Sequence, residues 1–130
     1  MSTLKTGKVK TTTIADELDT ESTAVTNVIN GSAKAWVNFN GTGTVAIRES
    51  FNVTSITDNS TGVYTVNFTN AMPDVNYAVT GSSRETASGN RNFQPLPDVT
   101  NTVSAVGIST IIGSTGGVAD SQYIHVAVFR

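Results

Sequence analysis

Hydrophobic and polar residues alternate along much of the chain from Ala33 onward. This period of two is clearest in segments 35–39 and 63–68, where every second side chain is apolar and Trp36 points away from its apolar neighbours. Such alternation places one face of a β-strand toward a core and the other toward solvent. The pattern predicts strands whose inward faces form the core, and we expect these side chains to be buried: Val37, Phe39, Val45, Ile47, Phe51, Val66 and Phe68.

Turn-forming residues separate the apolar segments. Residues 58–62 and 113–117 combine glycine with Ser, Thr, Asn or Asp, which favours tight turns, and the first cluster predicts a β-hairpin with the segment that follows it. Residues 82–92 are polar and predict an exposed loop. Pro95 and Pro97 keep the short piece between them out of any central strand.

The last segment is apolar on both faces. One face carries Ile124, Val126 and Val128, and the other carries Tyr123, His125, Ala127 and Phe129. Such a strand is typical of the centre of a sheet or of an interface, and a single sandwich can bury only one of its faces. The pattern over residues 33–130 therefore predicts an all-β fold, an antiparallel β-sandwich of jelly-roll-like type. We also expect the protein to assemble as a homo-oligomer.

Residues 1–32 differ in amino-acid composition from the rest of the chain. They contain no aromatic residue and seven branched aliphatic ones, too few to close a core. Helical spacing is possible there, whereas the threonine-rich flanks favour an extended arm, and a disordered leader is a further alternative. We interpret this segment as an N-terminal attachment arm. Its basic residues (Lys5, Lys8, Lys10) precede its acidic ones (Asp16, Glu17, Asp19, Glu21). We expect the following apolar side chains to bind a partner: Leu4, Val9, Ile14, Leu18 and Val25.

Composition narrows the possible partners. The net charge is −2, so the chain lacks the excess of positive charge that binds nucleic-acid phosphates. It has no cysteine for a disulfide or a thiolate metal site, and its start lacks the apolar run of a signal peptide. We expect synthesis in the cytoplasm of a host cell, no membrane insertion and no nucleic-acid partner.

Candidate chemistry is sparse. His125 is the single histidine, so a transition-metal site would lack a second imidazole, and no Gly-x-Ser-x-Gly motif accompanies it. The acidic residues that could form a glycosidase pair all lie in or beside predicted turns, where acids are common for backbone reasons: Glu49, Asp58, Asp74, Glu85, Asp98 and Asp120. We expect no catalytic residues, no metal and no cofactor.

One stretch of sequence resembles a known module. It comprises AKAWVNFNGTGTVAIR (33–48), FNVTSITDN (51–59), GVYTVNF (62–68) and AMPDVNY (71–77). Over about residues 33–80 the chain is similar to tail-fibre-like and other virion surface proteins of tailed bacteriophages, especially cyanophages and other marine phages. The resemblance implies a virion protein with a β-rich fold and trimeric assembly.

Together these observations predict a non-enzymatic phage virion structural protein, a short trimeric fibre or surface-attached protein that docks through its arm on other virion proteins. One alternative is a receptor-binding adhesin that recognises a host surface glycan through loops 82–92 and 113–117. Another is a capsid decoration or cement protein. Trp36, Tyr123 and Phe129 are candidate contacts for a subunit interface, another virion protein or a glycan.

Overall fold

The computed structural model describes residues 12–15, 22–86, 89–96 and 101–130. The chain divides into two compact units, Met1–Ser32 and Ala33–Arg130. The division falls where the amino-acid composition of the sequence changes. Each unit is described by itself below.

The first unit contains three short elements. Strands β1 (Thr13–Ala15) and β2 (Ser22–Ala24) pair antiparallel, and helix α1 (Val25–Gly31) follows β2 directly. The Val25 amide donates a hydrogen bond to the Thr12 carbonyl, with a nitrogen–oxygen distance of 2.9 Å. The helical spacing noted in the sequence therefore does not form one helix, because Ile14 lies in strand β1 whereas Val25 begins helix α1. Every described side chain of this unit is exposed or half-buried.

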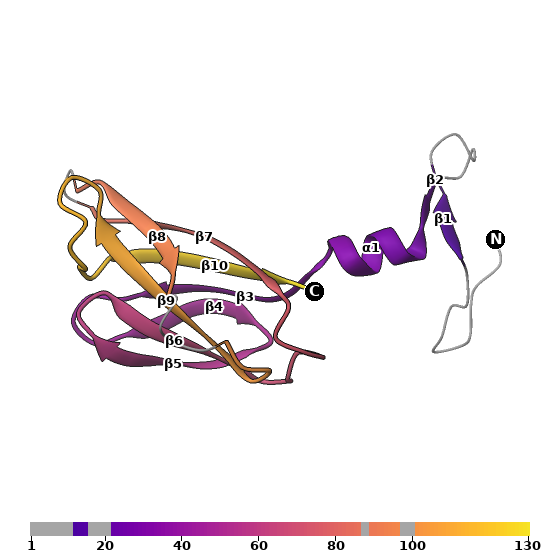
Figure 1. Cartoon of the computed structure of the whole chain (residues 1–130), viewed down its shortest axis with the longest axis horizontal. Coiled ribbons are helices and arrows are strands. Elements are labelled where there is room, and N and C mark those ends of the chain that lie inside the picture. The colour runs from indigo at the N-terminus through magenta and orange to yellow at the C-terminus, as the bar shows by residue number, and fades with distance from the viewer. Residues whose placement is uncertain (1–11, 16–21, 87–88, 97–100) are drawn as a thin grey trace. The chain divides into compact units, whose positions relative to one another are not determined.

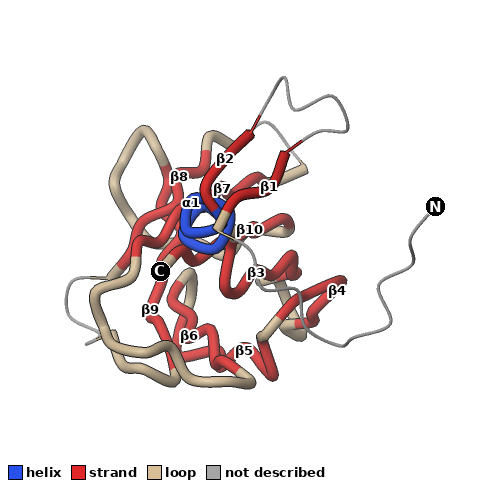
Figure 2. The backbone as a smooth tube through the Cα atoms, turned by 90° about the vertical axis from the view of Figure 1, so that its right-hand side faces the viewer, coloured by secondary structure: helices blue, strands red, loops and turns tan. Residues whose placement is uncertain are grey.

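The second unit is a sandwich of two antiparallel sheets (Figure 1), with strand orders β4-β3-β10-β7 and β5-β6-β9-β8. Figure 2 shows the two sheets as facing layers when viewed along the strands. The strands are β3 (Ala33–Asn40), β4 (Ala46–Phe51), β5 (Val53–Ser60), β6 (Val63–Phe68), β7 (Ala78–Arg84), β8 (Arg91–Pro95), β9 (Ala105–Ile112) and β10 (Tyr123–Phe129). This arrangement confirms the predicted all-β antiparallel sandwich.

The core lies between the two sheets, where the inward faces of the alternating strands meet. Val37, Phe39, Val66 and Phe68 are buried as predicted. Phe39 packs edge-to-face on Tyr64 with ring centroids 5.4 Å apart, a favourable arrangement for aromatic pairs. The side chains of β6, β9 and β10 complete the core from their inward positions.

Two predicted core residues are exposed, and a third is only half-buried. Ile47 is 37% exposed and Phe51 is 54% exposed, whereas Val45 is half-buried against the core. The error at Phe51 has a local cause. A bulge in the pairing of β3 with β4 puts Ile47 opposite the inward-facing Phe39 but Phe51 opposite the outward-facing Trp36. Asn52, with a positive φ of 54°, then turns the chain into the other sheet. The alternation changes phase there, so Phe51 points outward although Val53 points inward.

Several other expectations can be compared with the strands. The hairpin β5–β6 is confirmed, and its turn contains Gly62 at φ 68°. The predicted loop 82–92 is too long, because β7 continues to Arg84 and β8 begins at Arg91. Strand β8 is an edge strand, as its proline requires, and β10 is central between β3 and β7, as its two apolar faces predicted.

Candidate binding site on the outer sheet face

Strand β10 positions the candidate site because its side chains alternate between core and surface. Ile124, Val126 and Val128 are buried, while His125 is exposed and the other outward residues are half-buried. The outward residues therefore lie on the solvent-facing side of sheet β4-β3-β10-β7. This face carries all three aromatic residues that the sequence singled out, Trp36, Tyr123 and Phe129, since Trp36 lies opposite Ala127 on the same side.

Strand register places the outward residues in rows across the sheet. In the central row, His125 lies between Asn38 on β3 and Ser82 on β7, and Asn38 lies opposite Glu49 on β4. The row is polar from edge to edge. It offers an amide, an imidazole, a hydroxyl and a carboxylate at one surface.

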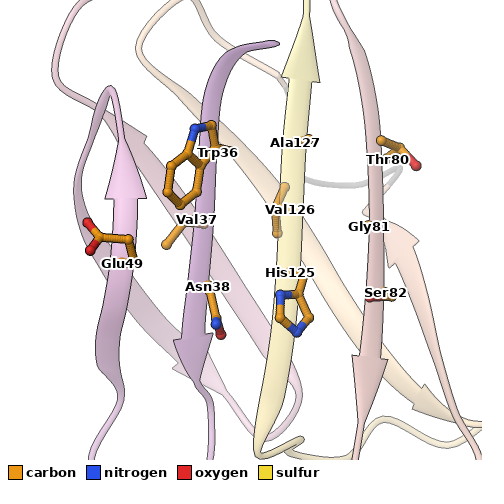
Figure 3. Close-up of a pocket in the computed structure, with 10 residues that line it drawn as sticks. All are labelled: Trp36, Val37, Asn38, Glu49, Thr80, Gly81, Ser82, His125, Val126 and Ala127. Carbon is orange, nitrogen blue, oxygen red and sulfur yellow. The ribbon is translucent and has the colours of Figure 1, made fainter.

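A shallow groove runs over these rows. It has a volume of about 480 Å³, and its lining includes the central polar row together with Trp36 and Thr80. Figure 3 shows Trp36, Asn38, Glu49 and His125 projecting from three neighbouring strands around it. An aromatic surface beside several hydrogen-bonding groups is the combination that binds amphipathic ligands.

Two arginines flank the ring of Tyr123 at one end of this face. The guanidinium carbon of Arg48 lies 4.6 Å from the ring centroid and that of Arg84 lies 5.1 Å from it, both within the range of cation–π contacts. Arg48 also donates hydrogen bonds to the Gln122 carbonyl at 2.7 Å and to Asn38 Oδ1 at 3.3 Å. A second concavity of about 410 Å³ adjoins the first here, since both include Ser82 and His125.

The opposite end of the face is apolar. Trp36 is 38% exposed and lies directly across from the more exposed Phe51, and Ala127 lies on its other side. Paired exposed aromatic side chains are uncommon on an isolated domain and mark surfaces that contact other molecules.

The outer face of the second sheet differs in kind. Asn67 Nδ2 donates to Ser55 Oγ at 3.2 Å and to Thr57 Oγ1 at 3.0 Å, and Asn59 Nδ2 donates to Thr65 Oγ1 at 2.9 Å. These hydroxyl and amide groups already satisfy one another. The exposed aromatic residues of the sandwich strands gather on the first sheet instead, which makes its outer face the candidate binding site.

Groups for catalysis do not converge on this face. Ser82 lies opposite His125, yet no hydrogen bond joins them in the described part of the chain, and no carboxylate bonds the imidazole there. Among residues 12–15, 22–86, 89–96 and 101–130, no group of three or more His, Cys, Asp or Glu side chains could hold a metal ion. Asp98 lies outside the described residues.

Two of the other acidic residues have structural partners. Asp120 Oδ1 accepts hydrogen bonds from the Tyr64 hydroxyl at 2.9 Å and from the Gly62 amide at 2.7 Å. Burial, with the added effect of the Asp120 carboxylate, raises the pKa of the Tyr64 hydroxyl well above its usual value. Asp74 pairs with Arg130 at the surface, and the hydrogen bond from Arg130 lowers the pKa of the Asp74 carboxyl.

The arm residues are only partly described. Ile14 is 48% exposed on β1, and Val25 is half-buried at the start of α1. Leu4, Val9 and Leu18 lie outside the described residues.

Sequence reasoning missed Arg48 as a member of the site, whereas Ser82 and Arg84 lie in the segment 82–92 that was predicted to contact a glycan as a loop. Ser82 and Arg84 were assigned to a loop, although their spacing of two residues is the signal that would place both on one face of a strand. Arg48 gave no such signal, because a bulge in the pairing of β3 with β4 shifts it out of register.

No protein-family model matches the chain, and comparisons with curated proteins and with solved structures find no match. Within the described ranges, no helix is long and apolar enough to span a membrane.

Proposed function

We propose that this chain is a non-enzymatic structural protein of a tailed-bacteriophage particle, a short trimeric fibre or surface-attached protein whose N-terminal arm docks on other virion proteins. The observation that carries the proposal is that the described residues of the first unit, 12–15 and 22–32, form no core. No described side chain of that unit is buried, and α1 has no buried residue. Ordering such a segment costs roughly 1–2 kcal/mol per residue, so another surface must supply the missing burial.

The second unit supports the proposal in a complementary way. It has a continuous core of its own, so it can stay folded while the arm engages a partner. The resemblance of residues 33–80 to virion surface modules points to a phage particle, and a place on the capsid as a decoration protein would use the same arm. The proposed location is the virion in either case.

Deletion of residues 1–32 tests this role. The truncated chain should keep the β-sheet circular dichroism spectrum and cooperative melting of the sandwich but no longer join particles. A chain with the same 32 residues in scrambled order is the matched control and should also fail to incorporate. Normal copy number of the truncated chain in purified particles would show that the sandwich, not the arm, is the anchor.

A second candidate role is recognition of a host surface glycan. The specific observation that favours it is the groove, where an exposed indole lies beside a row of hydroxyl, amide and imidazole groups. Sugars present an apolar ring face and a rim of hydroxyls, and such a surface complements both. This role is compatible with attachment through the arm, because the groove is built wholly from strands of the sandwich.

A further inference from the structure

We infer that the second concavity, which Arg84 and Tyr123 line and Arg48 adjoins through its contact with the Tyr123 ring, binds the carboxylate of an acidic oligosaccharide. The inference rests on the proposed glycan-recognition role and is independent of the arm. It names the chemical class of the ligand and the residues that would select it.

The two guanidinium groups are held in position before any ligand arrives. Arg48 is fixed by the Gln122 carbonyl, by Asn38 and by the ring of Tyr123, and Arg84 contacts the same ring from the neighbouring strand. A planar guanidinium stacked on an aromatic ring keeps most of its N–H donors free at the edge of the stack. Pre-organised donors lose little side-chain entropy when a ligand binds.

No acid in the described part of the chain forms an ion pair with either guanidinium. Across the described residues, the single ion pair is Arg130 with Asp74, which involves neither of these arginines. Arginine recognises carboxylates through paired N–H donors, and such charge-assisted hydrogen bonds are about twice as strong as neutral ones. Two unmatched guanidiniums around one ring therefore favour a ligand with a localised negative charge.

The surroundings distinguish a saccharide from a polyanion. Glu49 lies in the adjacent row and the whole chain carries a net charge of −2, so a chain of closely spaced phosphates would be repelled beyond the arginine pair. Ser82 and His125, in contrast, line both concavities and offer hydrogen bonds to hydroxyl groups. Carboxylate recognition at one end with hydroxyl recognition beside it fits an acidic sugar.

The groove and the second concavity together have the length for more than one sugar. Tyr123 and Ala127 are four positions apart on β10, and at about 3.4 Å per residue the arginine pair lies roughly 14 Å from the row that contains Trp36. An oligosaccharide could place its acidic residue at the arginine pair and a neutral ring near the indole. A monosaccharide would reach only one of the two ends.

Isothermal titration calorimetry of the full chain in low-salt buffer tests the inference with three probes: trigalacturonate, its neutral methyl ester and triglutamate. Trigalacturonate should bind, and Arg84→Gln should weaken its binding roughly tenfold or more, the value of one lost charge-assisted contact. Arg130→Gln removes the same charge from the surface ion pair at the end of β10 and should leave the affinity unchanged. Equal melting temperatures of both variants and the parent would show that each is folded.

Each other outcome overturns the inference in a distinguishable way. Equal affinity for the ester and the free acid would keep the glycan role but remove the carboxylate site. Equal Arg84-dependent affinity for triglutamate would assign the arginine pair to an acidic peptide. If no probe binds at concentrations up to about 5 mM, both the acidic-saccharide site and the glycan role fail, while the attachment role stays subject to the arm deletion.

Discussion

Phe39 and Phe51 carry the same side chain on neighbouring strands and differ in environment. Phe39 is buried and packs on Tyr64, whereas Phe51 is more than half exposed on the outer face. Removing a buried aromatic ring loses its transfer free energy and leaves a cavity, but removing an exposed one does neither. The contrast makes the two residues a matched pair.

Phe39→Ala should therefore lower the free energy of unfolding by about 3–5 kcal/mol, enough to leave little soluble protein. At chain concentrations low enough to keep the protein monomeric, Phe51→Ala should change it by less than about 1 kcal/mol. Urea denaturation followed by circular dichroism measures both values. A larger loss for Phe51→Ala than for Phe39→Ala would mean that the sheet faces are assigned the wrong way round.

Tyr64 is a residue whose stability contribution depends on pH. Its hydroxyl donates to the Gly41 carbonyl and to Asp120, and its pKa is raised by burial and by the nearby carboxylate. Because the folded-state pKa is higher than the unfolded value of 10.0, the unfolded chain releases this proton first as pH rises. The stabilisation is thus complete below about pH 10 and is lost progressively above it.

Tyr64→Phe should be less stable than the parent by about 1–3 kcal/mol at neutral pH, because it leaves Asp120 and a buried carbonyl without this donor. The difference between the two proteins should shrink above pH 10, where the parent loses stability through Tyr64. Thermal melts from pH 7 to about pH 11 follow both trends. Tyr123→Phe is the control, since its half-buried ring lies on the outer face, and a gap that widens at high pH would contradict the argument.

At the scale of the elements, the sequence predicted those features that the spacing of side chains within one strand determines. Strands β3, β6 and β10 carry unbroken alternation, so their inward faces and the central position of β10 followed from side-chain spacing. The phase of β4 did not follow, because a bulge opposite β3 breaks the alternation before Phe51, and Asn52 then turns the chain into the other sheet. Strand order could not be predicted either, since pairs such as β3 with β10 join segments from opposite ends of the domain.

The candidate site shows the same division between local and long-range information. Trp36, Tyr123 and Phe129 were found because each lies opposite to an apolar face within its own strand. Their meeting on one sheet with Arg48 and Arg84 depends on the pairing of four strands. Such clusters need the three-dimensional fold, because no spacing in the sequence links β4, β7 and β10.

At the scale of the whole sandwich, the two outer faces have different properties. The face of β5-β6-β9-β8 bears hydroxyl and amide groups that bond one another, whereas the face of β4-β3-β10-β7 exposes Trp36 and Phe51 side by side. Burial of an aromatic side chain stabilises a protein by about 1.5–3 kcal/mol. Covering the face of β4-β3-β10-β7 with another protein surface would therefore be the more stabilising of the two. A copy of the same chain is the partner that we propose for Phe51, which lies on the edge strand β4 and does not line the groove beside Trp36.

The chain should accordingly form a homo-oligomer, and a trimer is expected. Multi-angle light scattering at micromolar concentration should give about three times the 13.6 kDa mass of one chain. Phe51→Glu places a charge in the apolar end and should yield a folded monomer, since an unpaired carboxylate is costly to bury. Thr57→Glu adds the same charge to an exposed position of β5 on the other sheet and should leave the oligomer intact. A monomer mass for the unaltered chain would exclude self-assembly through this face. A trimer that persists with Phe51→Glu but dissociates with Thr57→Glu would instead place the subunit interface on the sheet β5-β6-β9-β8.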